Sequence, residues 1–235
     1  MRFLRLFVLL GGMFLAIGLL IVGTAMAADS IETPKHTVLM QASAPIGEAT
    51  IEHRRYEPMI VAEVTVEADD RDAASSKGFR PLAGYIFGRN APSERIAMTA
   101  PVATAPADGG AIPTGGGERI AMTAPVTTAP SDAEGTDGRY TVRFMMPSQY
   151  TMDALPAPLD PAVELVEVPG RDIVALRFVG ERSAERVDAA ASAVDAFIAE
   201  RGLKPIGPYA VAGYDGPDVP TAERRWEVQR PVATR

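Results

Sequence analysis

The chain has 235 residues, a net charge of -7, 47% apolar and 23% charged residues, and no cysteine. This composition is typical of one globular domain that carries at most a targeting segment, and the acidic balance without a Lys/Arg cluster excludes a nucleic-acid partner. The lack of cysteine excludes disulfides, thiolate metal sites and thiol nucleophiles, and two histidines are too few for a histidine cluster.

The first 27 residues form a targeting segment. Arg2 and Arg5 make a basic start, and residues 6–27 are uncharged and end in Ala-Met-Ala, a small-x-small cleavage pattern. The length suits a membrane-spanning helix of about 20 residues, whereas the glycines and the Ala-Met-Ala end favour a cleaved signal peptide. Residues 1–27 are therefore a signal peptide or a signal anchor. Either way we expect the remainder to lie outside the cytoplasm, periplasmic, secreted or anchored to the inner membrane.

Residues 28–47 are polar, contain two prolines, and read as a spacer. We expect the folded domain to span residues 48–232. It begins with two strands within Ile51–Glu67, which are interrupted at Glu57-Pro58. The second strand alternates clearly, with Ile60, Ala62, Val64 and Val66 on one face.

We predict a helix over Arg71–Gly88. One apolar stripe contains Phe79, Leu82, Ala83 and Ile86, at helical spacing. Gly78 and Pro81 predict a kink or a restart in its middle, and Gly88 a C-terminal stop.

An internal repeat follows this helix. ERIAMTAPVATAP at 94–106 returns as ERIAMTAPVTTAP at 118–130, with twelve of thirteen positions identical, and a glycine-rich loop lies between the copies. In each copy Ile, Met, Ala and Val alternate onto one face, which predicts two extended segments. The proline in each copy places these segments at an edge or a bend.

The C-terminal half repeats the order of elements. We expect a strand at Tyr140–Met146, a hairpin of Val163–Val168 and Ile173–Val179, a helix at Ser183–Arg201 with Ser183 as its cap, and strands at Tyr209–Tyr214 and Arg225–Gln229. Strands in antiparallel runs with two separate helices predict an α+β fold. Two similar halves could close into a barrel with both helices outside.

Several of these segments together resemble the SOUL/heme-binding protein family. The matching stretches follow the family's order over about 180 residues: YEPMIVAEV at 56–64, GFRPLAGYIFGRN at 78–90, ERIAMTAPV at 94–102, VRFMMPSQYT at 142–151, LPAPLDPAVEL at 155–165 and GYDGP at 213–217. The resemblance implies a distorted antiparallel β-barrel built from two similar halves and flanked by two helices.

The resemblance also implies non-covalent binding of heme or another tetrapyrrole in an apolar surface cleft beside the first helix, to buffer, carry or scavenge it. Carried over by motif, the cleft residues are Phe79, Leu82, Ala83 and Ile86, or whichever of them face outward, and Lys77 and Arg80 are candidates for the propionates. No motif requires a protein axial ligand to the iron.

Alternatives remain open at this stage. His53 is an axial ligand or an ordinary half-exposed strand residue, and Met98 and Met122 contact a ligand or fill a core. No nucleophile elbow, metal-ligand spacing or phosphate-binding loop is present, so we expect no enzyme and no metal. The competing functions are an enzyme acting on a small amphiphile and an envelope protein-interaction module. The sequence does not fix the oligomeric state.

Overall fold

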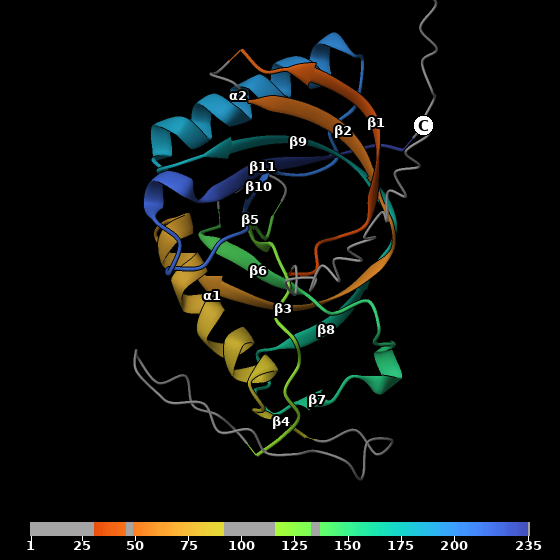
Figure 1. Ribbon diagram of the computed structural model, residues 1–235, viewed down its shortest axis with the longest axis vertical. Coiled ribbons are helices and arrows are strands. Elements are labelled where there is room, and N and C mark those ends of the chain that lie inside the picture. Colours follow the sequence, from red (N-terminus) through yellow and green to blue (C-terminus); the bar gives the residue numbers. More distant parts are fainter. Residues whose placement is uncertain (1–30, 46–48, 92–115, 133–136, 235) are drawn as a thin grey trace, which may run out of the picture. The chain divides into compact units, whose positions relative to one another are not determined.

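The computed structural model describes residues 31–45, 49–91, 116–132 and 137–234. They form a nine-stranded antiparallel sheet that curls into a half-barrel, a two-stranded sheet, and two helices (Figure 1). The predicted α+β class and barrel-like fold are confirmed. The targeting segment predicted at 1–27 lies outside the described residues. Among the helices that the structure describes, none combines the length and apolarity needed to cross a bilayer.

The elements follow one another as β1 (His36–Ser43), β2 (Thr50–Tyr56), β3 (Met59–Glu67), α1 (Arg71–Ile86), β4 (Asn90–Ala91), β5 (Val126–Pro130), β6 (Arg139–Met145), β7 (Ala157–Pro158), β8 (Glu164–Val168), β9 (Arg171–Val179), α2 (Ala184–Glu200), β10 (Ala210–Gly213) and β11 (Arg225–Val232). Two short 3-10 turns lie at Met152–Ala154 and Thr221–Glu223.

The two predicted halves are present in the order of the strands. The large sheet runs β1-β2-β9-β11-β10-β5-β6-β3-β8. One half is β3-α1-β5-β6 and the other is β9-α2-β10-β11. In each half the helix lies between the first and second strands in sequence, and the third strand pairs with both others. The two halves join where β10 pairs with β5.

Both helices pack on the same face of the sheet, the outer one, and each covers its own half (Figure 1). Helix α1 packs Leu82 and Ile86 against Val64 and Val142 of β3 and β6. Helix α2 presents an apolar stripe to β9, β10 and β11, as its sequence period predicts. Each large side chain buried in this way contributes about 1.5–3 kcal/mol, so these two clusters hold the helices in place. The opposite face of the sheet lines the inside of the curl.

Helix α1 is one continuous element that includes Pro81, so it does not restart there. Asp70 caps it by accepting a hydrogen bond from the Ala73 N–H at 2.8 Å. Gly78 is buried where the helix comes closest to β6, so close that an added Cβ would lie 2.5 Å from a Val142 methyl. Gly88, with φ 100°, ends the helix as predicted.

Two expectations are wrong. Residues 31–45 are not merely a spacer, because they contribute β1, which pairs with β2 along its whole length. As an edge strand β1 is largely exposed, so its sequence carries no buried alternation that would reveal it. The strands around Pro169-Gly170 do not form a hairpin either. β8 pairs with β3, whereas β9 pairs with β2 and β11, so this turn carries the chain from one half to the other.

The second copy of the repeat is described and the first copy, with Met98, lies outside the described residues. Only Val126–Pro130 is strand. Of the four residues predicted to share one face, Ile120 and Ala124 are buried and Val126 is half-buried, whereas Met122 is 52% exposed, so it does not fill a core. The side chain of Asn90 holds this segment beside the end of α1, because its amide donates to the Tyr85 and Glu118 carbonyls and accepts from the Glu118 N–H.

Candidate functional site

The outer face of α1 carries three of the six residues that the sequence analysis selected. Lys77, Phe79 and Arg80 are exposed, and Phe79 keeps 37% of its surface in solvent. The Phe79 ring meets the buried Phe144 ring edge-on, with centroids 5.4 Å apart. The Lys77 ammonium donates to the Glu67 carbonyl at 2.9 Å, so its side chain reaches toward the end of β3. At 3.6 residues per turn Lys77 and Phe79 do not face each other, and Arg80 lies between them on the exposed face of the helix.

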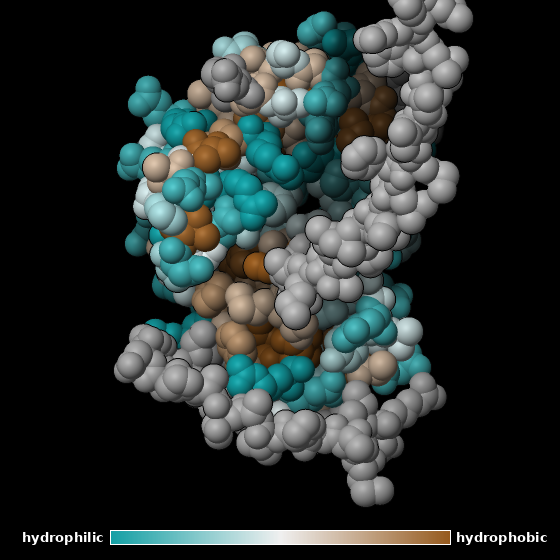
Figure 2. Space-filling model, in the orientation of Figure 1, coloured by the Kyte–Doolittle hydropathy of each residue, from teal (hydrophilic) through white to brown (hydrophobic). Residues whose placement is uncertain are grey.

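The other three residues face the opposite way. Leu82, Ala83 and Ile86 are at most 3% exposed and belong to the core under α1. A helix on a sheet must bury one stripe, so Leu82, Ala83 and Ile86 hold α1 to β3 and β6 and are not available to an external ligand while the helix stays packed. Of the six predicted cleft residues, Lys77, Phe79 and Arg80 remain candidates. Their contact with a ligand stays a prediction. Figure 2 shows apolar surface gathered over the C-terminal half of α1 and the adjoining chain that leads to β5.

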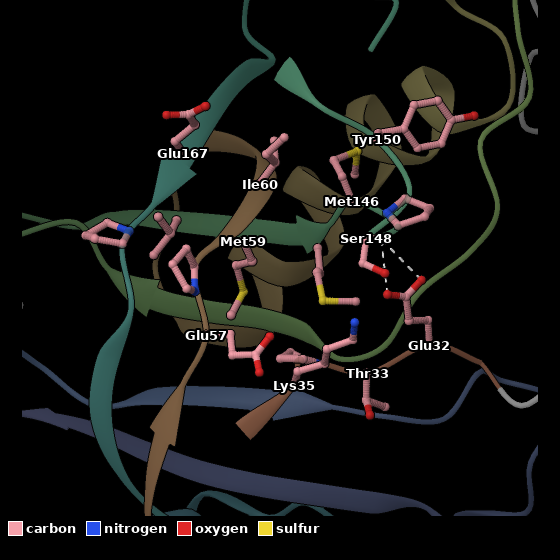
Figure 3. A pocket seen from close by; sticks show the side chains of 16 residues that line it. Glu32, Thr33, Lys35, Glu57, Met59, Ile60, Met146, Ser148, Tyr150 and Glu167 are labelled. Atoms are coloured by element: carbon pink, nitrogen blue, oxygen red, sulfur yellow. Dashed lines mark hydrogen bonds between the residues drawn. The ribbon is translucent and has the colours of Figure 1, made fainter. Parts of the chain in front are cut away.

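A second candidate surface is a groove of about 650 Å³ at the end of β3, β6 and β8 (Figure 3). This volume is within the range of about 300–1,000 Å³ that small-molecule sites occupy. Thioethers and aliphatic groups make its floor, and prolines from four segments make its walls. The lining residues are Glu32, Thr33, Pro34, Lys35, Glu57, Pro58, Met59, Ile60, Met145, Met146, Pro147, Ser148, Tyr150, Glu167, Val168 and Pro169.

The groove carries more negative than positive charge. Lys35 is the single cation in its lining, and Figure 3 shows its ammonium group directed inward, toward the methionine side chains. Glu32, Glu57 and Glu167 provide three carboxylates. The Glu32 carboxylate accepts the Ser148 N–H at 3.1 Å, which fastens the segment before β1 to the chain after β6. The groove is apolar inside and acidic at its rim.

The inner face of the half-barrel holds a buried ionic network around Glu227. This carboxylate is fully buried and receives both terminal nitrogens of Arg54 at 3.0 Å. Arg177 donates to it from Nε at 2.9 Å, and the Tyr214 hydroxyl and the Gln229 amide each donate at 2.7 Å. Such a bidentate Arg–carboxylate pair with further donors satisfies every lone pair of the acid. Glu227 is therefore a structural anion and not a free base.

The pKa directions in this network follow from burial and pairing. Burial alone would raise the pKa of Glu227, but the charge and hydrogen bonds of Arg54 outweigh it and hold that pKa below its ordinary value. Burial, followed by the negative charge of Glu227, raises the pKa of the Tyr214 hydroxyl far above its ordinary value. Tyr56, which accepts from Arg54, has a pKa raised mainly by burial. All these groups keep one protonation state around neutral pH.

His53 lies on the outer face of β2 and is 5% exposed, so the half-exposed position expected for it is wrong. Its Nε2 is 3.5 Å from an oxygen of Asp172, which also forms two hydrogen bonds with Arg55. An imidazole enclosed in this way has no open approach for an iron atom. The structure gives no support to axial ligation by His53.

The described residues contain no identifiable catalytic set. Glu63 is bound by Arg143, whose Nε donates to it at 2.6 Å, and the buried Tyr85 hydroxyl donates to the Pro156 carbonyl at 2.9 Å. In the part of the chain that the structure describes, no group of three or more His, Cys, Asp or Glu side chains could hold a metal ion. The side chains of Glu63 and Tyr85 are therefore both engaged in contacts within the domain.

The sequence analysis predicted neither the groove nor the Glu227 network. The alternation in RWEVQR (225–230) could have placed Glu227 and Gln229 on one face and Trp226 and Val228 on the other. Nothing in the sequence pairs Glu227 with Arg54, which lies 173 residues away in the chain. The groove is made of four separated segments, each unremarkable alone.

The described domain carries a hollow of the size that small-molecule sites occupy. A family model described as SOUL heme-binding protein matches residues 31–231, so the chain belongs to this family. Human heme-binding protein 2 is 38% identical over 76 residues, which is 32% of this chain and 36% of that protein. The match therefore spans about a third of that relative's length.

Solved structures share the fold at low sequence identity. A hydrolase from Listeria innocua superimposes with a TM-score of 0.52 and 14% identity over 78% of this chain and 91% of its own. The C-terminal domain of EcmrR gives 0.50 and 15% over 80% of this chain and 98% of its own. At such identities these likenesses show the fold alone.

Proposed function

We propose that this protein binds heme or a related tetrapyrrole non-covalently, with the ring against the outer face of α1. Membership of the SOUL heme-binding family over residues 31–231 is the observation that carries the proposal. A flat apolar ring gains roughly 25 cal/mol for each Å² that it removes from water, and the exposed Phe79 offers such a surface. The iron would need no protein ligand, and the propionates would stay at the surface.

Charge favours the face of α1 over the groove as the place of binding. A tetrapyrrole with two propionates is a dianion at neutral pH, because carboxyl groups ionise near pH 4. Lys77 and Arg80 both lie on the exposed face of α1, whereas the groove sets three carboxylates against Lys35. One pair of unit charges about 5 Å apart is worth on the order of 1–3 kcal/mol near a protein surface. The groove is hollowed, but its lining has the wrong charge for a dianion.

An absorbance titration of the full chain with hemin tests the proposal. We expect a saturable Soret change in the micromolar range, because binding costs offset much of the gain from apolar burial. The double variant Lys77→Glu/Arg80→Glu should weaken hemin binding by about tenfold or more, since two attractions become repulsions. Both side chains are exposed, so the variant keeps its core.

Two further variants locate the site. Lys35→Glu makes the groove more acidic, and Lys204→Glu makes the same charge change at an exposed position after α2. Both should bind hemin like the wild type. A non-saturable titration of the wild type would overturn the binding proposal. Loss of hemin binding in Lys35→Glu alone would show that the ring binds in the groove and not on α1.

We further propose that the protein works outside the cytoplasm, as a buffer, carrier or scavenger of the tetrapyrrole. The basic start and the uncharged stretch 6–27 support this location. Fractionation of the native cell followed by intact-mass measurement tests it. The protein should be found in the envelope or beyond it, either starting near residue 28 or still carrying residues 1–27. A soluble cytoplasmic pool with an intact N-terminus would contradict it.

A further inference from the structure

A small cavity lies on the inner face of the half-barrel, apart from both α1 and the groove. It has a volume of about 240 Å³ and is lined by residues of β5, β6, β9, β10 and β11 and of the adjoining turns. Arg143 and Arg171 line it together with the hydroxyl-bearing residues Thr127, Ser131 and Thr141. Its lining contains no aspartate and no glutamate. The cavity is therefore positive.

Arg171 carries a charge that no described carboxylate neutralises. Its Nη1 is buried and has no acceptor within hydrogen-bond distance among the described residues. Burial, followed by the nearby charge of Arg143, lowers the pKa of Arg171 below its ordinary value. Guanidinium groups remain charged in proteins, so this arrangement keeps two like charges close to one cavity. A buried charge without a partner destabilises the fold, and an incoming anion would offset that cost.

Two carboxylates of the inner face, Glu227 and Glu63, are already engaged by other arginines. Glu227 is held by Arg54 and Arg177 and by two neutral donors. Glu63 accepts from Arg143 Nε at 2.6 Å, which compensates that arginine in part. The excess positive charge of the inner face thus remains at Arg171.

We propose that this cavity binds a small oxyanion, either an inorganic phosphate or a short carboxylate, between Arg171 and Arg143. A guanidinium presents two parallel N–H groups that match the oxygens of a carboxylate or phosphate. Threonine and serine hydroxyls supply further donors to such a ligand. The volume is too small for a tetrapyrrole and sufficient for an anion of a few heavy atoms. The site is independent of the proposed heme function.

Isothermal titration of the full chain, in a buffer free of phosphate and sulfate, tests this site with two probes, potassium phosphate and sodium succinate. Sodium chloride at equal ionic strength is the blank. The wild type should give saturable heat with at least one probe, and the stronger probe identifies the geometry of the ligand. Arg171→Met should bind the anion at least about tenfold more weakly, because methionine lacks the paired guanidinium N–H groups while keeping an apolar stem. Arg139→Gln, an exposed change on the same strand as Arg143, should bind like the wild type.

The thermal midpoint without added anion separates a binding role from a structural one. Arg171→Met should unfold at the same temperature as the wild type or above it, because it removes an unpaired buried charge. Arg171→Lys keeps the charge without the paired N–H groups and should weaken anion binding several-fold, which tests the site even if the methionine variant does not fold. Absence of saturable heat with both probes in the wild type, or unchanged affinity in the lysine and methionine variants, overturns the proposal. Hemin titration of Arg171→Met should be normal whatever the outcome.

Discussion

Glu227 makes the sharpest residue-scale prediction. Glu227→Gln keeps the shape of the side chain but removes the buried carboxylate that Arg54 and Arg177 share, which leaves Arg54 only Glu52, 2.6 Å from its Nε. Removing one partner of a buried ion pair costs about 3–5 kcal/mol, so the free energy of unfolding should fall by that amount in a urea titration. Asp195→Asn, which breaks an exposed pair with Arg230, should cost less than about 1 kcal/mol. Equal effects of the two substitutions would contradict the account of the inner face.

The same carboxylates predict how stability depends on pH. The pKa of Glu227 lies below its ordinary value because of Arg54, and the hydrogen bonds from Arg55 lower the pKa of Asp172. A carboxyl group with a depressed pKa in the folded state stabilises the fold above its unfolded pKa of about 4, and this contribution is lost as the pH falls through the folded pKa. Thermal midpoints should therefore be constant from pH 8 to pH 6 and decline steeply below about pH 4. Glu227→Gln should show a smaller decline.

At the residue scale, the sequence predicts which side chains are buried better than it predicts which side chains pair with one another. Periodicity correctly put Ala62 and Val64 on one face of β3, and Leu82 and Ile86 on one stripe of α1. The same stripe was read as a ligand surface, and only packing shows that Leu82 and Ile86 face the sheet while Phe79 remains exposed. Partners such as Arg54 and Glu227 come together through the pairing of β2, β9 and β11, which no local pattern encodes.

At the scale of elements, Gly78 determines how closely α1 approaches the sheet. Replacing a mid-helix glycine by alanine normally raises the free energy of unfolding by about 0.5–1 kcal/mol. Here the new Cβ would lie 2.5 Å from Val142 Cγ2 and 3.2 Å from Val64 Cγ1, and overpacking of this kind costs about 1–3 kcal/mol. Gly78→Ala should therefore lower the free energy of unfolding in urea. Ser76→Ala, on the exposed face of the same helix, should leave it unchanged or raise it slightly. A stabilised Gly78→Ala protein would show that α1 can move outward freely.

Elements with strong local signals were predicted well, and edge or crossover elements were not. Ser183 and the apolar stripe of α2 identified that helix, and Ser183 Oγ does accept the Arg186 N–H at 3.3 Å. β1 was missed because an exposed edge strand needs no apolar alternation. The turn at Pro169-Gly170 was read as a hairpin because sequence proximity usually indicates pairing, whereas here the turn links the two halves.

At the scale of the whole described domain, three hollows or faces of different polarity share one sheet. The outer face of α1 combines Phe79 with two cations, the groove near Met59 is apolar with an acidic rim, and the inner cavity at Arg171 is positive. Because the three surfaces differ in charge and polarity, they suit different ligands. Each can therefore be tested by a substitution that leaves the other two unchanged.

Paramagnetic broadening of backbone amide NMR signals by hemin tests the central claim most directly. Ferric iron broadens nearby amide signals, so the pattern of loss maps the position of the ring, and the diamagnetic zinc porphyrin is the matched control. The account predicts selective broadening around Lys77, Phe79 and Arg80 that saturates with added hemin. Broadening centred on Met59 and Ser148, or no selective broadening at all, would contradict it.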